Sequence, residues 1–252
     1  MFKTGLVSVS FRSLSVDEII ALAREAGLEY IEWGTDVHAT VGDRARLEYI
    51  RDAQAAAGVR TSSLGTYFCI GTDSTESLTE YIRAARLLCT DVLRIWCGKK
   101  GYMDMTEEER AYIRAEAKKA ACIAQDEGVI LCLECHNHTY TDSLEGALDI
   151  MKSTDSDSFL MYWQPNQFKS EDENLKYAAE ISKYTKNIHV FNWSGKERYP
   201  LSLGASIWQS YLSVFRKDTM LLLEFMPDND PRSLAREAES LRKICSDIGD
   251  KI

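Results

Sequence analysis

The sequence lacks any apolar run near the roughly 18 residues that a membrane-spanning helix needs. It also lacks an excess of positive charge, because 30 lysines and arginines face 39 aspartates and glutamates, giving a net charge of -9. Broad nucleic-acid binding requires a basic surface, so we expect neither a nucleic acid nor a membrane as partner. The N-terminus enters a strand-like segment without a signal-peptide pattern, which predicts a cytoplasmic protein.

Two phosphate-binding fingerprints are also missing, since the chain contains neither a GxGxxG pattern nor a P-loop. Cysteines are few, and their odd number, seven, is scattered and not spaced as a disulfide framework, which favours reduced thiols. Cys132 and Cys135 form a CxxC pattern, but it lies along a predicted strand. Successive strand residues point to opposite faces, so we expect neither a redox nor a zinc role for this pair.

What the chain does contain is a repeated alternation of a short apolar run with a longer amphipathic segment. The alternation occurs eight times in 252 residues, which is the count of a (β/α)8 TIM barrel with a parallel sheet. We therefore predict an α/β fold with a single barrel domain over residues 1–252; a doubly wound open sheet is the alternative. The predicted strands are Thr4–Ser10, Leu28–Trp33, Val59–Leu64, Val92–Cys97, Val129–Glu134, Phe159–Gln164, Ile188–Asn192 and Met220–Phe225.

Helix-start signals follow several of these strands. A residue that can cap a helix, followed three positions later by glutamate, predicts a capping box, and a proline in the first turn also marks a helix start. These signals are Ser15 with Glu18, Thr106 with Glu109, Asp142 with Glu145, and Pro231.

Polar side chains collect where the predicted strands end. In a barrel of this kind the C-terminal strand ends carry the site. Four of these ends belong to consecutive strands, so their inward-pointing side chains can converge on one divalent ion, Mn²⁺, Mg²⁺, Co²⁺ or Zn²⁺. The polar or aromatic strand ends are Glu32, Trp96, Glu134, Gln164, His189 and Glu224, and the four consecutive ones are Glu134, Gln164, His189 and Glu224.

Each member of this set has an ordinary structural alternative. Glu134 and Glu224 both follow three apolar residues, and a buried carboxylate costs several kcal/mol unless it is paired or binds a metal. A salt bridge to an arginine such as Arg94 would satisfy either glutamate. His189 could be a core histidine with both ring nitrogens hydrogen-bonded. The four residues together indicate a site more strongly than any one of them.

The chain resembles the xylose-isomerase-like TIM-barrel superfamily, in its sugar phosphate isomerase/epimerase branch. In that superfamily a divalent metal is held by Glu, Asp, His and Glu from strands five to eight. The resemblance places these roles on Glu134, Gln164, His189 and Glu224. The stretches that carry it are Ile31–His38, Leu93–Gly98, Leu133–His136, Tyr162–Asn166, Ile188–Asn192 and Leu223–Phe225.

Gln164 departs from the family pattern, in which aspartate is commoner. A neutral amide oxygen is a weaker ligand than a carboxylate, so the metal affinity is expected to be weakened, and loss of the metal is the alternative. The resemblance also implies that Glu134 and Glu224 act as opposed acid and base on carbon next to a carbonyl. The proton transfer would pass through an enediolate.

Further residues near the strand ends are candidates for substrate binding. His136 lies two residues after Glu134 and on an extended backbone shares its face. Trp96 could form an apolar wall, and an arginine could bind a phosphate or carboxylate. For each, barrel packing or a solvated loop position is the alternative. The substrate-binding candidates are His38, Arg94, Trp96, His136 and Arg198.

The sequence leaves four functions to compare. A sugar isomerase or epimerase is the first, and a keto-inositol dehydratase-type lyase would use the same metal and carboxylates. A non-catalytic sugar-binding barrel is supported mainly by Gln164. An apurinic endonuclease of the superfamily needs a three-metal cluster rich in histidine, and four histidines in an acidic chain argue against it. We expect a small sugar or polyol as the partner. The sequence leaves open whether the protein forms a homo-oligomer.

Overall fold

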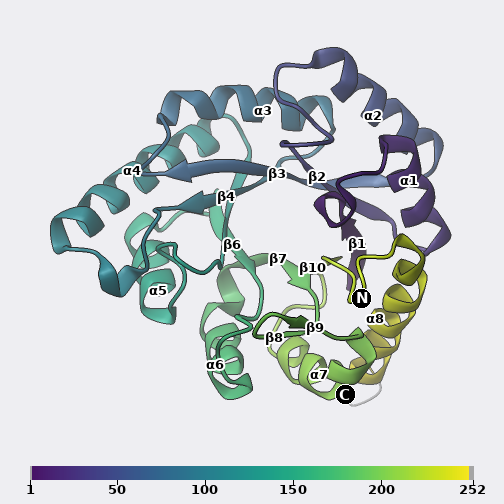
Figure 1. The fold of residues 1–252 in the computed structure, drawn as a ribbon. Coiled ribbons are helices and arrows are strands. Elements are labelled where there is room, and N and C mark those ends of the chain that lie inside the picture. Colours follow the sequence, from purple (N-terminus) through teal and green to yellow (C-terminus); the bar gives the residue numbers. More distant parts are fainter. Residues whose placement is uncertain (1, 250–252) are drawn as a thin grey trace.

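In the computed structural model, which describes residues 2–249, eight parallel strands close into a barrel in the order β1-β10-β7-β6-β5-β4-β3-β2. Figure 1 shows the strands at the centre, with the chain running around them. The predicted (β/α)8 barrel is confirmed. The barrel strands are β1 (Lys3–Val7), β2 (Tyr30–Gly34), β3 (Arg60–Ile70), β4 (Val92–Cys97), β5 (Ile130–Glu134), β6 (Phe159–Trp163), β7 (Thr185–Val190) and β10 (Met220–Leu223).

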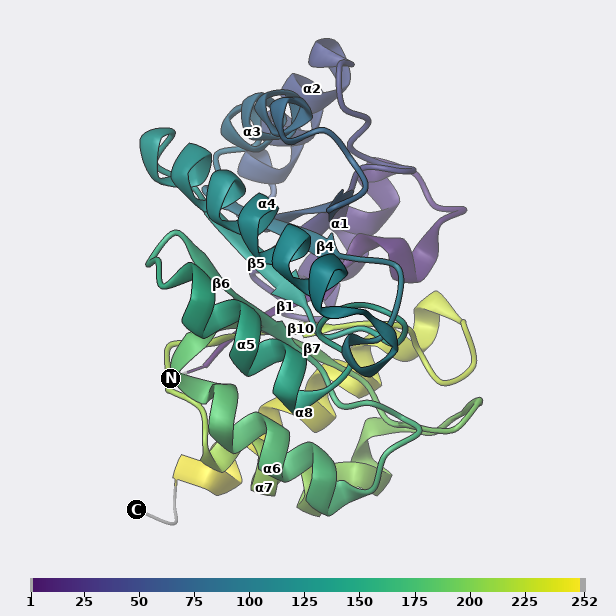
Figure 2. The same cartoon turned by 90° about the vertical axis from the view of Figure 1, so that its left-hand side faces the viewer.

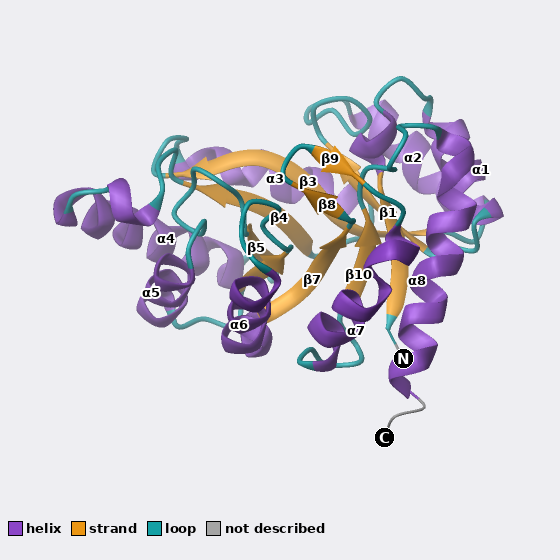
Figure 3. Ribbon diagram, turned by 60° about the horizontal axis from the view of Figure 1, so that its bottom comes forward, coloured by secondary structure: helices purple, strands orange, loops and turns teal. Residues whose placement is uncertain are grey.

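Eight α-helices within residues 2–249 surround the barrel, and α4, α5 and α6 lie side by side on one flank (Figures 2 and 3). The apolar stripe of each helix packs on the outward-facing residues of the strands. No helix in this part of the chain is both long and apolar enough to cross a membrane. The helices are α1 (Val16–Glu25), α2 (Arg44–Ala56), α3 (Leu78–Leu87), α4 (Glu107–Asp126), α5 (Leu144–Thr154), α6 (Glu171–Ile181), α7 (Ala205–Ser213) and α8 (Leu234–Gly249).

The helix-start signals are correct at two of the three predicted capping boxes. Ser15 and Thr106 each accept the backbone N–H three residues on, and the glutamate of each box bonds back. The prediction that Asp142 caps α5 is wrong. Ser143 occupies the cap and accepts the Gly146 N–H, because the Asp142 carboxylate turns away and accepts the N–H of Tyr102.

Among the described barrel strands only β4 has its predicted bounds, and β1, β3 and β7 differ most. β1 ends at Val7 and not at Ser10, because Ser8–Phe11 form a 3-10 helix. β3 continues to Ile70, six residues beyond its predicted end, because its last residues pair with Trp96 and Cys97 of β4 after an irregularity in the register. β7 begins at Thr185 and not at Ile188, because Thr185 pairs with β6 although its side chain carries no apolar signal.

A short hairpin that the sequence did not predict follows β7. Its antiparallel strands are β8 (Trp193–Ser194) and β9 (Glu197–Arg198). The turn between them contains Gly195 with φ +58°, a conformation that glycine adopts without strain. The Gly195 N–H donates to the Gln167 carbonyl at 2.9 Å, which ties the hairpin to the loop after β6.

The barrel wall separates two hydrophobic cores. Cys132 belongs to a small cluster inside the barrel, whereas Cys135 belongs to the larger core between strands and helices. The predicted opposite orientation of the CxxC thiols is confirmed. Tyr162 also belongs to the inner cluster, so alternation along β6 brings Gln164 to the same inward face, just above it. The inner core therefore forms the floor on which the polar strand ends rest.

Candidate active site

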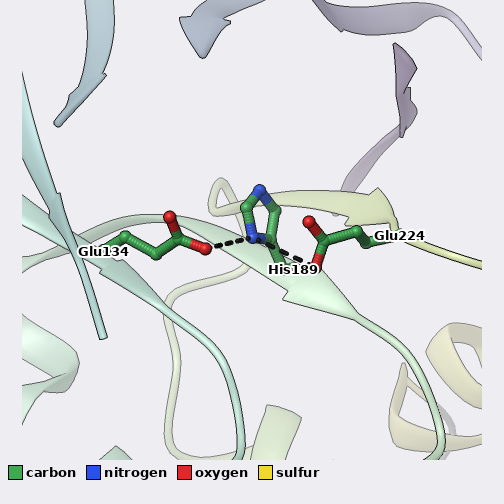
Figure 4. A group of neighbouring side chains, drawn as sticks. All are labelled: Glu134, His189 and Glu224. Carbon is green, nitrogen blue, oxygen red and sulfur yellow. Dashed lines mark ion pairs between the residues drawn. The ribbon is translucent and has the colours of Figure 1, made fainter. Parts of the chain in front are cut away.

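The structure brings the four predicted strand-end residues together around one ring nitrogen, Nδ1 of His189. Gln164 Oε1 lies 3.0 Å from this nitrogen, Glu134 Oε1 at 3.4 Å and Glu224 Oε2 at 3.5 Å. Figure 4 shows His189 between the two glutamates, which approach it from opposite sides. Glu134 ends β5, Gln164 follows β6 and Glu224 follows β10, so the barrel register produces the convergence.

A buried polar network lies beneath this group. Glu32 of β2 is fully buried, and its Oε2 accepts hydrogen bonds from the hydroxyls of Tyr162 and Ser63. The same oxygen lies 3.4 Å from Nε2 of His189. A carboxylate behind an imidazole fixes which ring nitrogen points forward. Glu32 therefore keeps Nδ1 of His189 directed at the cluster.

Arg94 connects the buried network around Glu32 with the cluster around Nδ1 of His189. Its Nε donates to Glu32 at 2.8 Å and its Nη1 donates to Glu134 Oε2 at 2.5 Å, with only 4% of the arginine exposed. Trp96 Nε1 donates to the same Glu134 oxygen at 2.5 Å. One oxygen of Glu134 is thus held by two donors, and the other, Oε1, faces His189. The salt bridge that the sequence left as an alternative for Glu134 is present.

The surrounding charges shift the pKa values of this cluster in different directions. Burial alone would raise the pKa of Glu32, but Arg94 and His189 hold it at about 2. Burial would also raise the pKa of Glu134, but the Arg94 charge outweighs it and holds this pKa well below its ordinary value. Burial would lower the pKa of His189, but Glu224 and Glu32 raise it to about 10. Burial raises the pKa of Glu224; the His189 charge opposes this effect and the Glu134 charge adds to it. Two facing glutamates therefore differ in basicity.

The cluster opens into a cavity of about 100 Å³ at the barrel mouth. Its wall combines carboxylates and amides with aromatic rings, and none of the described residues that line it is lysine or arginine. A small hydroxyl-bearing molecule matches such a wall better than a strongly anionic one. The lining includes Glu134, His136, Asn137, Asp142, Gln164, Asn166, Gln167, Phe191, Trp193, Glu224 and Phe225.

The five predicted substrate-binding residues are placed differently. His136 lines the cavity and stacks on Trp96 with 4.9 Å between ring centroids. Arg198 is not among the residues that line the cavity, but its guanidinium lies over the rings of Trp193 and Phe225, which are. His38 is not brought to the cavity; it is buried, with its ring nitrogens at 3.1 Å from Ser8 Oγ and 3.0 Å from the Leu14 carbonyl. Arg94 lies below the cavity, as described above.

Sequence reasoning placed Glu32 among the polar strand ends but gave it no role, and it gave none to Tyr162 or Ser63. A signal for Tyr162 was available, because it lies two positions before Gln164 and so shares its inward face. Ser63 gave no signal, since its register with Glu32 depends on an irregularity in β2–β3 pairing. The hairpin residue Trp193 was missed because the hairpin itself was missed.

The residues present fit a divalent cation. Glu134, His189 and Glu224 each offer one ligand atom, and these atoms lie within 4.8 Å of one another. Carboxylate oxygen and imidazole nitrogen suit Mn²⁺, Co²⁺ and Zn²⁺, and Gln164 Oε1 adds a neutral oxygen. A histidine that binds a metal through one ring nitrogen usually donates its other ring N–H to a carboxylate. Glu32, which contacts Nε2 of His189, is in the position of that carboxylate.

A family model described as "Xylose isomerase-like TIM barrel" matches residues 20–245. Three solved structures resemble the chain over nearly their whole length. The "probable 3-DHS dehydratase AsbF" from Bacillus anthracis is 18% identical with a TM-score of 0.81, covering 96% of this chain and 99% of that chain. D-psicose 3-epimerase from Clostridium cellulolyticum H10, in structures with D-tagatose, is 14% identical with a TM-score of 0.74, covering 98% and 99%.

The third, a xylose isomerase-like TIM barrel protein from Mycobacterium smegmatis in complex with magnesium, is 14% identical with a TM-score of 0.73 and covers 98% of both chains. No curated protein matches the sequence. At these identities the structural likeness shows the fold.

Proposed function

Since this chain belongs to the xylose isomerase-like TIM barrel family, we propose that it is a metal-dependent isomerase or epimerase of a small sugar or sugar phosphate. The observation that carries the proposal is the pair Glu134 and Glu224 on opposite sides of His189 at the mouth. Two carboxylates facing across a gap can exchange protons with both faces of a flat intermediate.

The metal would be held by Glu134, His189 and Glu224, with Gln164 Oε1 as a further donor. A bound divalent ion supplies positive charge that stabilises the negative charge developing on a substrate oxygen. Arg94 keeps Oε2 of Glu134 fixed, so that Oε1 alone faces the ligand position.

Glu224 is the proposed base, because its pKa is raised and its carboxylate lines the cavity. It takes the proton from the carbon next to the carbonyl; the C–H electron pair becomes the double bond of an enediolate, and the carbonyl oxygen takes the negative charge. If the hydroxyl proton on the first carbon moves to the former carbonyl oxygen and Glu224 returns its proton to the former carbonyl carbon, the sugar is isomerised. If Glu134 takes up a proton from solvent and delivers it to the opposite face of the same carbon, while Glu224 releases its proton to solvent, the stereocentre is inverted. His136 and Trp96 remain our candidates for contacts to substrate hydroxyl and C–H groups.

A dehydratase-type lyase is the second candidate. The same proton removal by Glu224 would begin the loss of a hydroxyl group from the next carbon, and the AsbF structure matches the whole barrel with a TM-score of 0.81. Product analysis separates the two, since a lyase releases water and leaves a carbon–carbon double bond that absorbs in the ultraviolet.

The test begins with metal content, measured by mass spectrometry after dialysis against Mn²⁺, Mg²⁺, Co²⁺ or Zn²⁺. The loaded protein is then incubated with ketoses and aldoses in D₂O, free and phosphorylated. We expect one equivalent of metal and metal-dependent deuterium uptake at the carbon next to the carbonyl. Absence of both metal binding and deuterium uptake would instead leave a non-catalytic sugar-binding barrel.

Gln164→Glu is expected to tighten Mn²⁺ binding about tenfold. The change keeps the length of the side chain whose Oε1 lies 3.0 Å from Nδ1 of His189 and adds a negative charge there. Calorimetric titration of both proteins with Mn²⁺ measures the difference. Gln167→Glu is the matched control, because it adds the same charge to the cavity wall without a contact to His189. Equal affinity changes in the two variants would mean that Gln164 is not a ligand.

A further inference from the structure

A larger cavity of about 450 Å³ adjoins the inner cavity of about 100 Å³. The two share Asn137, Asp142 and Asn166 in their walls. The Asn166 amide donates to Asn137 Oδ1 at 2.5 Å, which links the loops after β5 and β6 across the boundary. A ligand whose reacting part reaches Glu134 and Glu224 can therefore extend past this pair of amides into the outer cavity.

Two large apolar side chains stand exposed at the outer cavity. Phe168 is 63% exposed and Met103 is 71% exposed, and both line it. The loop that carries Phe168 is fixed: Asn166 Oδ1 accepts the Phe168 N–H at 2.9 Å, and the Asn166 N–H donates to Asn174 Oδ1 at 2.8 Å. An exposed aromatic ring on a loop held by side-chain hydrogen bonds is a preorganised contact surface.

The polar groups around these side chains suit hydroxyls better than an anion. Within residues 2–249, neither the Asp104 carboxylate nor the His138 imidazole has a hydrogen-bond partner, so both can bond to a ligand. The one lysine of the lining, Lys169, donates to the Asp142 carbonyl at 2.9 Å. With two aspartates against this lysine, the outer cavity would repel a phosphate. A ring with hydroxyls on its edge and C–H groups on its face matches Phe168, Asp104 and His138 together.

We propose that the outer cavity binds a second sugar ring, so that the substrate is a neutral keto sugar carrying a glycosyl group. This inference rests on the proposed function, because it assumes that the reacting sugar lies in the inner cavity. The glycosyl ring packs on Phe168 and Met103, and its hydroxyls bond to Asp104 and His138.

The test compares D-fructose with three ketose-terminated disaccharides: lactulose, turanose and isomaltulose. Binding to the Mn²⁺-loaded protein is measured by calorimetry, and deuterium uptake from D₂O is followed separately. We expect at least one disaccharide to bind more tightly than D-fructose. In Phe168→Ala the ratio of disaccharide to fructose affinity should fall about tenfold. Tyr112→Ala, which removes an aromatic ring 55% exposed on α4, should leave that ratio unchanged.

The outcomes separate the two proposals. If D-fructose binds and exchanges deuterium but no disaccharide binds more tightly, the second-ring proposal is overturned and the proposed function stands. If a disaccharide binds more tightly and Phe168→Ala lowers its affinity ratio, but no sugar exchanges deuterium, the outer cavity is supported and the isomerase is not. If the ratio of disaccharide to fructose affinity is unchanged in Phe168→Ala, the second ring does not pack on Phe168 and the second-ring proposal is overturned.

Discussion

Replacing Glu224 by glutamine is expected to lower kcat for metal-dependent deuterium uptake about a thousandfold. Glutamine keeps the size of the side chain and one carbonyl oxygen but cannot accept the proton from carbon. The raised pKa of Glu224 makes it the better base of the pair, because Glu134 is stabilised as a carboxylate by Arg94 and Trp96. The measurement is the initial rate at saturating Mn²⁺, so that a weaker metal site does not account for the loss.

Glu197→Gln is the matched control for this variant. Glu197 lies on the nearby hairpin strand β9 with an exposed side chain, so its substitution removes the same charge without removing a group of the cavity. It should retain the wild-type rate. A Glu224→Gln protein that binds Mn²⁺ and exchanges deuterium at near the wild-type rate would exclude Glu224 as the base.

Arg94→Met is expected to lower the free energy of unfolding by about 3–5 kcal/mol. The substitution fills a similar space but leaves two buried carboxylates, Glu32 and Glu134, without the cation that both of them contact. Arg60→Met is the control, because Arg60 pairs with Glu29 at the surface, where both side chains are 62% exposed. That change should cost less than about 1 kcal/mol. Urea denaturation of the variants and the wild type measures both differences.

A second substitution tests whether the cost comes from the uncompensated carboxylate. Glu32→Gln in the Arg94→Met background removes one of the two unpaired charges, so part of the lost stability should return. If the double variant is less stable than Arg94→Met by the full cost of Glu32→Gln alone, the two residues are not coupled, and the account of Arg94 given above is wrong.

The barrel itself could be predicted from the sequence because its signals are local. Each strand is a short apolar run, and the capping boxes at Ser15 and Thr106 mark helix starts within four residues. The convergence of Glu134, His189 and Glu224 followed from strand order alone, since parallel neighbours end at the same rim. Their catalytic roles, and the assignment of the whole chain to one domain, stay predictions.

What the sequence could not supply depends on contacts between distant residues. Glu32 is held by Arg94, 62 positions away, and by Tyr162, 130 positions away, so nothing near Glu32 indicates its partners. The residues around His38 in the sequence do not distinguish it from a surface histidine. In the structure its ring nitrogens contact the Ser8 hydroxyl and the Leu14 carbonyl, which lie 30 and 24 positions away. The hairpin strands of two residues each are too short to produce an alternation pattern.

The pairing of β1 with β10 has a consequence for the order in which the protein can become functional. Leu6 pairs with Leu223, so the ring closes only when the last strand meets the first, and Glu224 follows that strand directly. A chain emerging from the ribosome has made Glu134 and His189 well before Glu224. The complete set of three ligand atoms therefore exists only after the final strand has been synthesised and inserted, so partly made chains lack the proposed base.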